Sequence, residues 1–563
     1  MNKIFLAAVL IATPLLAKSD PDLKRPRAGE TVEVLVTYAA QPSEAHHQRV
    51  IAHKGKVHSR FSNVPVGHYS VTPEALDDLE KNPDVVSISP NRPLRSMDDL
   101  GDSSINYYPL DDYYHSINRA KAGGIGIAIL DSGLNTAHPN FNRWSSTVSR
   151  IVYSESFVGG DTSDQYGHGT HVTGIAAGVD NVIYGISDAT RWVYGVAMDS
   201  NIINLKVLDA SGNGTDAGVI AGIDRAITLK STYNIRVMNL SLGRPVSVSY
   251  RSDPLCQAVE RAWKAGIVVV VAAGNNGRDN SQGTNGYGTI TAPGNDPYVI
   301  TVGAVNHKSD WDRASDVIAT YSSKGPTAID HIAKPDLVAP GNRVVSYQAP
   351  SSLLVTQFPD NRFKYSDYSA SGSTSFSPYY MTLSGTSMAT PFVAGAAAML
   401  LDRNPNLTPD QVKAKMMKTA WRGFPTSVST YDPATQKTYT SYHDLFTVGA
   451  GQLDIYAAYM NNDTPPGSAA SPLAYYDNAS KTVKLQLNST GATTVVWGTT
   501  LVWGTTVVWG TTVVWGTTVF WGTTLVWGTT STSGFSIVWG TTSPWAASGT
   551  ATESLSITGN GEN

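Results

Sequence analysis

The chain has 563 residues, of which 15% are charged, with a formal net charge of -4 at pH 7 and one cysteine. This length allows three or four domains, the small net charge gives no reason to expect a nucleic-acid partner, and a single cysteine excludes any disulfide within the chain. The low charged fraction and abundant glycine are more typical of an exported enzyme than of a cytosolic one.

The first residues predict export. Residues 1–19 contain a lysine at position 3, an apolar run from Ile4 to Leu16 and the small residue Ala17. This run is too short to cross a membrane and has the pattern of a cleaved signal peptide. No later stretch is apolar over the length that a span requires. We therefore expect a secreted protein without a membrane span, and attachment to a cell surface is left open.

Residues 20–95 are predicted to form a small α+β domain. Apolar alternation favours strands over 31–38, 61–71 and 85–90, and helical spacing favours helices over 42–54 and 73–82. The resulting order is βαββαβ-like. Residues 96–115 are loop-like and are expected to link this domain to the next one.

Residues 116–460 alternate apolar runs with helix-sized segments. The runs lie at 126–131, 201–208, 236–243, 266–275 and 299–305. Continuous apolar runs of this kind are typical of strands buried on both faces, so we predict an α/β domain with a mainly parallel sheet and helices on both sides. Ligands of such sheets bind beyond the carboxyl ends of the strands.

Polar residues stand at four marked places in this domain. Asp131 ends the first apolar run, His168 opens a helix of small residues, and Ser387 follows Gly385 at the start of another helix. A serine hydroxyl needs a base, and the base needs an orienting carboxylate, so these residues are candidates for nucleophilic catalysis. Asn275 ends the most apolar run and could donate its amide N–H to an oxyanion.

The blocks Asp131–Gly133, Gly167–His171 and Gly385–Ala389, in this order, resemble those of the subtilisin-like serine proteases, the subtilases. The resemblance implies a triad of Asp131, His168 and Ser387, with Asn275 and the Ser387 backbone N–H as the oxyanion hole. It also implies that one segment, Ser241, Leu242 and Gly243, pairs with the backbone of the substrate. A second segment, Ala272, Ala273 and Gly274, would line the pocket for the substrate residue that precedes the cleaved bond. We interpret His171, three residues beyond His168, as a packing histidine.

The resemblance extends to processing and partners. It implies that residues 20–95 are an inhibitory propeptide removed by a cut in the linker, although an unrelated small domain that stays attached is the alternative. Proteins or peptides would be the substrates, and the chemistry would need no cofactor. Structural calcium occurs in the family, but residues 180–193 lack the expected compact pattern, so no calcium ligands can be named.

The last part of the chain is repetitive. Residues 461–494 are expected to be a linker and spacer, residues 495–545 repeat the unit Val-Val-Trp-Gly-Thr-Thr, and residues 546–563 form a tail. A period of six is even, so in an extended strand every Trp would point to one face. Two interpretations stay open. The repeats form stacked strands for self-association or for binding a glycan or cell surface, or they are an unstructured low-complexity tail.

Together these features predict a secreted serine endopeptidase made as a zymogen. The rival from another class is an adhesive or scaffold protein in which a catalytically silent body displays the Trp repeats. The presence of all four catalytic residue types favours the enzyme.

Overall fold

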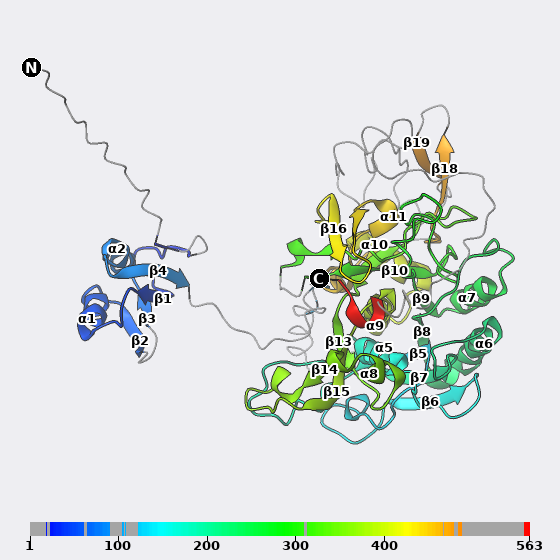
Figure 1. Ribbon diagram of the computed structural model, residues 1–563, viewed down its shortest axis with the longest axis horizontal. Helices are drawn as coiled ribbons and strands as arrows, with labels where there is room; N and C mark the ends of the chain where they lie inside the picture. The colour runs from blue at the N-terminus through cyan, green and yellow to red at the C-terminus, as the bar shows by residue number, and fades with distance from the viewer. Residues whose placement is uncertain are drawn as a thin grey trace, which may run out of the picture. The chain divides into compact units, whose positions relative to one another are not determined.

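The computed structural model describes residues 18–19, 23–60, 65–90, 104–105, 107, 122–308, 312–465, 467–477, 482–486 and 557–562. The chain divides into two compact units, Met1–Arg95 and Ser96–Asn563 (Figure 1). The predicted repeat at 495–545 and nearly all of the predicted signal peptide and linker lie outside the described residues.

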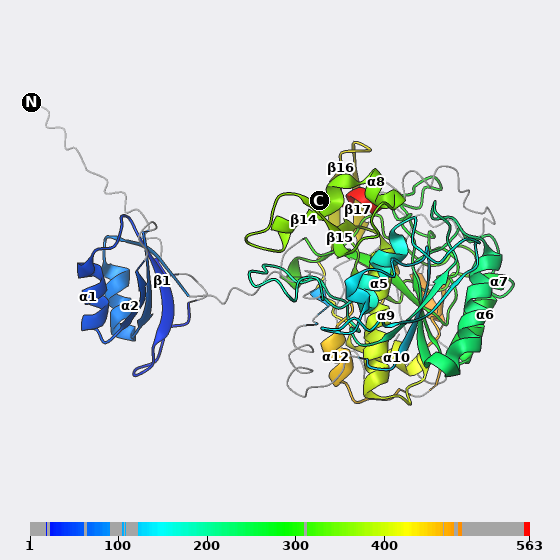
Figure 2. The ribbon, with the colours of Figure 1, turned by 90° about the horizontal axis from the view of Figure 1, so that it is seen from below.

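The first unit is an antiparallel four-stranded sheet with strand order β2-β3-β1-β4 and two helices. Its elements are β1 (Val32–Tyr38), α1 (Glu44–Ala52), β2 (Lys56–Arg60), β3 (Val66–Val71), α2 (Pro73–Lys81) and β4 (Val85–Pro90). Both helices lie on the same face of the sheet (Figure 2). Alternate residues of β1 are buried between sheet and helices, as the alternation predicts. The order is βαββαβ, but β2 is not among the predicted strands: it lies between the predicted helix over 42–54 and the predicted strand over 61–71, which contains β3.

The second unit is built on an eight-stranded sheet with order β11-β10-β9-β8-β5-β7-β6, in which β12 also pairs with β10. Its strands are β5 (Gly126–Asp131), β6 (Ile151–Ser156), β7 (Asn201–Lys206), β8 (Ile235–Leu240), β9 (Val268–Ala272), β10 (Ile300–Asn306), β11 (Val317–Ile318) and β12 (Leu337–Pro340). Only the β10–β11 pair in it is antiparallel. The predicted α/β class with a mainly parallel sheet is confirmed.

Helices cover both faces of this sheet (Figure 2). On one side lie α6 (Asp216–Tyr233) and α7 (Pro254–Lys264), and on the other lie α5 (His168–Ala177), α9 (Thr386–Arg403) and α10 (Pro409–Thr419). Helices α5 and α9 pack closely because Gly395 has no side chain: a Cβ there would lie 2.8 Å from the carbonyl oxygen of Ala176. Every residue of β5 and β9 is buried by this double cover.

Smaller elements surround the main sheet. They include a three-stranded sheet of order β13-β15-β14 and the hairpins β16–β17 and β18–β19. Their bounds are β13 (Val344–Tyr347), β14 (Arg362–Lys364), β15 (Phe376–Leu383), β16 (Ser427–Asp432), β17 (Lys437–Tyr442), β18 (Leu473–Asp477) and β19 (Thr482–Gln486). Short helices complete the unit: η1 (Pro139–Phe141), η2 (Arg313–Ser315), α8 (Leu353–Gln357), η3 (Pro359–Asn361), η4 (Tyr365–Asp367), α11 (Leu445–Val448) and α12 (Ile455–Met460).

Parts of the predicted connecting segments pack against the second unit. Within 96–115, the Ser104 hydroxyl donates to Asp316 Oδ2 over 2.6 Å, and Ile105 is fully buried. Within 461–494, Leu485 of β19 joins the core of the second unit, and within 546–563, Ile557 does so too. Among the described residues, no helix is both long and apolar enough to cross a membrane.

Candidate active site

Asp131 and His168 form a buried pair at the carboxyl edge of the main sheet. Asp131 is the last residue of β5, and His168 is the first residue of α5. Asp131 Oδ1 accepts hydrogen bonds from His168 Nδ1 over 2.8 Å and from the backbone N–H of Ser132 over 2.7 Å. Because Nδ1 is engaged, Nε2 of His168 is the nitrogen available to take a proton.

The environment of His168 sets its protonation. Burial by itself would lower the pKa of His168, but the neighbouring Asp131 carboxylate outweighs burial, and the net shift of the pKa is upward from 6.5. An imidazolium formed during a reaction is therefore stabilised where it stands, which is what a general base next to a buried carboxylate requires.

Asp164 is a structural residue of the site that the sequence interpretation missed. Its carboxylate accepts from the backbone N–H groups of Gly167 (2.7 Å) and Thr170 (2.8 Å) at the start of α5, and from the hydroxyl of Ser132 (2.8 Å). It thereby joins the end of β5 to the start of the helix that carries His168. Burial raises its pKa. A carboxylate four residues before a helix-opening histidine is the local signal that points to such a cap.

Ser387 is the second residue of α9 and is held by Ser241, which follows β8. The hydroxyl of Ser387 donates to the Ser241 carbonyl oxygen over 3.1 Å, and the hydroxyl of Ser241 donates to the Ser387 carbonyl oxygen over 2.8 Å. The second bond has a local cause. Pro391 lies four residues further along the helix and has no N–H, so the Ser387 carbonyl has no helical donor. Ser241 therefore supplies the missing donor.

Helices α5 and α9, which carry His168 and Ser387 at their starts, pack against each other. Both helices begin at the carboxyl edge of the main sheet, and their contact at Ala176 and Gly395 lies eight residues beyond His168 and Ser387, respectively. Among the described residues the Ser387 hydroxyl bonds to Ser241 and not to His168. Catalytic hydrogen bonds of this type commonly tighten only when substrate binds.

Asn275 follows β9 and faces the turn before Ser387. Its Oδ1 accepts from the backbone N–H of Thr386 (2.9 Å) and from the Thr386 hydroxyl (3.1 Å). This orients the amide so that Nδ2 lies toward Gly385, where an added Cβ would be 3.1 Å from it. Gly385 has φ of +140°, a conformation that glycine adopts without strain. The Nδ2 group has no hydrogen-bond partner among the described residues and can donate to a ligand.

The two predicted substrate-binding segments lie on either side of Thr291. A Cβ on Gly243 would lie 2.5 Å from Thr291 Oγ1, and a Cβ on Gly274 would lie 2.7 Å from Thr291 Cγ2. Thr291 is 5% exposed and donates its hydroxyl to the Ala273 carbonyl over 3.2 Å. Its branched side chain therefore fills the space that the two glycines leave open. The remaining predicted positions in these segments are Ser241, Leu242 and Ala272, of which Ser241 contacts Ser387.

Residues 180–193 are held together by a carboxylate. Asp180 accepts from the backbone N–H groups of Val193 (2.6 Å) and Ile183 (3.2 Å), and from the Tyr380 hydroxyl (2.6 Å). Burial raises the pKa of Asp180 to about 6. Within the described part of the chain, no group of three or more His, Cys, Asp or Glu side chains is arranged to hold a metal.

The other residues that the sequence singles out, His171 and the single cysteine Cys256, are buried. His171 is fully buried and bonds through Nε2 to the Met381 carbonyl over 3.2 Å, and burial lowers its pKa to about 3. This agrees with a packing role. Cys256 is also buried, with Sγ 3.2 Å from Asn295 Oδ1, and burial raises its pKa, which favours the unreactive thiol.

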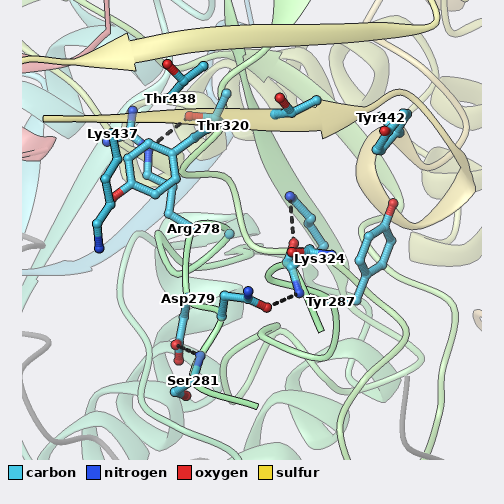
Figure 3. Close-up of a pocket in the computed structure, with 14 residues that line it drawn as sticks. Arg278, Asp279, Ser281, Tyr287, Thr320, Lys324, Lys437, Thr438 and Tyr442 are labelled. Atoms are coloured by element: carbon cyan, nitrogen blue, oxygen red, sulfur yellow. Dashed lines mark hydrogen bonds between the residues drawn. The ribbon is translucent and has the colours of Figure 1, made fainter. Parts of the chain in front are cut away.

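A polar cavity of about 900 Å³ lies beside the residues that follow Asn275. Figure 3 shows Arg278 at its wall, where Nε donates to Thr320 Oγ1 over 2.9 Å. The guanidinium also stacks 4.5 Å from the Tyr439 ring centre of β17. Lys324 enters from the opposite wall, and burial lowers its pKa to about 8. The lining residues do not include the three triad candidates.

Comparison with known proteins identifies the family of this chain. Residues 122–451 match the Subtilase family. The Serine protease AprX of Bacillus subtilis (strain 168) is 34% identical over 369 residues, which is 64% of this chain and 75% of that protein. Subtilisin DY of Bacillus licheniformis is 34% identical over 340 residues, 60% of this chain and 92% of that protein. A crystal structure of a cold adapted subtilisin-like serine proteinase matches 54% of this chain and 84% of its own at 29% identity, with a TM-score of 0.38. The family match runs from just before the strand that ends on Asp131 to well beyond the helix that carries Ser387, and the chain therefore belongs to the subtilases, a family of serine endopeptidases.

Proposed function

We propose that this subtilase cleaves internal peptide bonds through Ser387, His168 and Asp131. The observation that carries the proposal is the 2.8 Å bond between His168 Nδ1 and Asp131, made at the start of a helix that packs beside the nucleophile helix. Ser387 Oγ attacks the substrate carbonyl carbon while its proton moves to His168 Nε2. The Asn275 amide and the Ser387 backbone N–H receive the oxyanion. His168 then protonates the leaving amine, and water, deprotonated by His168, releases the acyl group from Ser387.

The pocket for the residue before the cut lies, in this proposal, between Gly243 and Gly274 and is narrowed by Thr291. A filled pocket favours small or medium residues over Phe and Tyr at that position. The Thr291→Gly variant is expected to accept aromatic residues, as read from a peptide-library cleavage profile.

The proposal includes export and delayed activation. The apolar run at residues 4–16 supports export as a signal peptide. The first unit supports an inhibitory propeptide because it is a compact α+β unit with its own core, immediately upstream of the protease. The Trp repeats supply a surface for self-association or for binding glycans or a cell surface.

The test of the chemistry uses two variants. Ser387→Ala should abolish peptide hydrolysis and labelling by a fluorophosphonate probe, and should leave the first unit uncut in a protease-free host. Asn275→Leu should still be labelled but turn over about 10²- to 10³-fold more slowly, the loss expected for one oxyanion donor. A wild-type chain that the probe does not label would favour the catalytically silent scaffold instead.

A further inference from the structure

The chain returns to the catalytic unit after the repeats. Residues 487–556 connect β19 to residues 557–562, which we call the return segment. Leu485 and Ile557 belong to the same hydrophobic core, so both ends of the connecting stretch are fixed on this unit. Figures 1 and 2 show the return segment in red beside the mark for the chain end.

The carboxylate of Glu562 occupies a built site. Glu562 is 3% exposed. Its Oε1 accepts from Arg278 Nη2 over 2.7 Å and from the Thr320 backbone N–H over 2.8 Å, and the Thr320 hydroxyl also bonds to it. Arg278 is itself buried and also donates to Asp432 at the end of β16 over 2.7 Å. Loss of Glu562 therefore leaves Arg278 paired with Asp432, whereas loss of Arg278 would leave the buried Glu562 carboxylate without its counter-ion.

The backbone of the return segment is bound as specifically as its carboxylate. Asn342 donates from Nδ2 to the Glu562 carbonyl over 2.8 Å and accepts at Oδ1 from the Glu562 N–H over 2.6 Å. The backbone N–H of Ser384 donates to the Thr558 carbonyl over 2.9 Å. Asn361 Nδ2 donates to the carbonyl of Gly559.

Two glycines of the return segment lie directly against side chains of the catalytic unit. A Cβ on Gly559 would lie 2.1 Å from the Phe358 ring, and a Cβ on Gly561 would lie 2.4 Å from the Ser384 hydroxyl. Gly561 also has φ of +62°. The two glycines and the carboxylate are therefore held at fixed places against the catalytic unit.

These contacts are made to residues close in the chain to both halves of the proposed oxyanion hole. Arg278 lies three residues after Asn275, and Ser384 lies three residues before Ser387. The turn before Ser387 is also tied to Gly341, whose carbonyl accepts from the Gly385 N–H over 2.7 Å. The residue after Gly341 is Asn342, which binds the backbone of Glu562. One short segment thus bonds to the loop after the oxyanion donor, to Asn342 and to the turn before the nucleophile.

We propose that the return segment is an intramolecular clamp that positions Asn275 relative to Ser387, and that Glu562 is the positioning residue that fastens it. This inference rests on the proposed peptidase function. A displacement of about 1 Å between a nucleophile and its supporting groups can lower turnover by about 10²-fold. The clamp also fixes the far end of the repeat-bearing stretch next to the active site.

The test compares Glu562→Ala with the isosteric Glu562→Gln. Glu562→Ala should lower kcat per titrated active site by about 10- to 100-fold, with KM changed by less than about 2-fold, because the clamp orients the catalytic groups and does not bind substrate. Glu562→Gln keeps the acceptor for Thr320 and Arg278 and should recover most of that loss. Glu155→Ala is the matched control, because Glu155 lies on the outermost strand β6 and pairs there with Arg225 of α6. The kcat of this control should equal that of the wild type.

Active-site titration separates positioning from folding. If Glu562→Ala has fewer titratable sites but wild-type kcat at each of them, the clamp is purely structural and the inference is overturned. Gly561→Ala, which places a methyl group on the Ser384 hydroxyl, should reproduce the loss of kcat. The inference fails equally if Gly561→Ala keeps full kcat while the Ser387→Ala chain is inactive, and in that case the proposed peptidase function still stands.

A mixing experiment tests whether the clamp acts within one chain. Ser387→Ala chains carry an intact return segment, and Glu562→Ala chains carry an intact triad. If the clamp is intramolecular, the mixture should hydrolyse peptide no faster than its Glu562→Ala component alone. Recovery of activity on mixing would mean that the segment binds a second copy and would overturn the assignment to a single chain.

Discussion

Ser387, the proposed nucleophile, shows how a missing backbone donor is replaced by a side chain. Helices normally satisfy each carbonyl with an N–H four residues later, and Pro391 removes that donor for Ser387. Ser241 fills the gap with its hydroxyl at 2.8 Å and in return accepts the Ser387 hydroxyl at its own carbonyl. The strand end after β8 thus fixes the nucleophile through two reciprocal bonds, which explains why this proline is compatible with the helix.

This arrangement predicts coupling between Ser241 and Pro391. In a Ser387→Ala background, which prevents self-digestion, Ser241→Ala should lower the free energy of unfolding by about 1–3 kcal/mol, because a partly buried carbonyl loses its donor and Asn239 Nδ2 loses its acceptor. After Pro391→Ala restores an N–H at residue 391, the same Ser241→Ala change should cost about 1 kcal/mol less, because only the Asn239 bond is then lost. Urea unfolding of the four chains measures the difference. An equal cost in both backgrounds would show that the Ser241 hydroxyl does not serve this carbonyl.

At the scale of elements, a buried ion network fixes β12 to α10. Asp336, just before β12, accepts from Lys334 over 2.6 Å and lies 3.0 Å from Lys413 of α10, and all three side chains are fully buried. Burial lowers the pKa of Lys334 to about 7. Burial by itself would raise the pKa of Asp336, but the two lysines outweigh it and the pKa falls. The carboxylate is therefore the group that makes both buried ammonium ions tolerable.

Removal of that carboxylate should be costly. Asp336→Ala leaves two buried lysines without their counter-ion, and we expect a loss of about 3–5 kcal/mol in the free energy of unfolding. The matched control is Asp463→Ala, which breaks the pair with Lys418 at a site where Asp463 is 58% exposed, and it should cost less than about 1 kcal/mol. Thermal or urea unfolding measures both variants. Similar losses in the two would contradict a special role for the buried network.

The elements also show what local sequence can reveal. The runs ending at Asp131 and Asn275 predict strands β5 and β9 because burial on both faces demands continuous apolar residues. The hairpin β18–β19 lies in a stretch that was expected from the sequence to be a spacer. Its strands are five residues each, which is too short for a clear alternating pattern. Glu562 could not be found at all, because its partner Arg278 is 284 residues away and no periodicity encodes such a contact. Candidate catalytic residues were visible in local motifs, and Asp164 has a local signal in its position before His168, whereas the return segment depends on tertiary packing.

At the scale of the whole molecule, the two units differ in how much core they possess. The first unit has a small separate cluster of buried apolar residues. The second unit has a continuous core that spans the main sheet and its helices. Domains below about 80 residues gain only about 3–5 kcal/mol from such a core. The first unit therefore has little stability to lose, whereas the second can tolerate single core defects.

This difference predicts that a core defect in the first unit affects maturation rather than catalysis. Leu76 of α2 is fully buried, and Leu76→Ala should cost about 2–5 kcal/mol, enough to unfold the unit. If the unit is a propeptide that assists folding, the yield of active mature enzyme should fall severely, while kcat of the molecules that do mature should be unchanged. The matched control is Ile51→Ala, because Ile51 is 44% exposed in the same unit. Separately produced wild-type first unit, added during refolding of the Leu76→Ala chain, should restore the yield. Normal maturation of Leu76→Ala, after circular dichroism has shown that the separately produced variant unit is unfolded, would mean that the first unit is not needed for the second to fold.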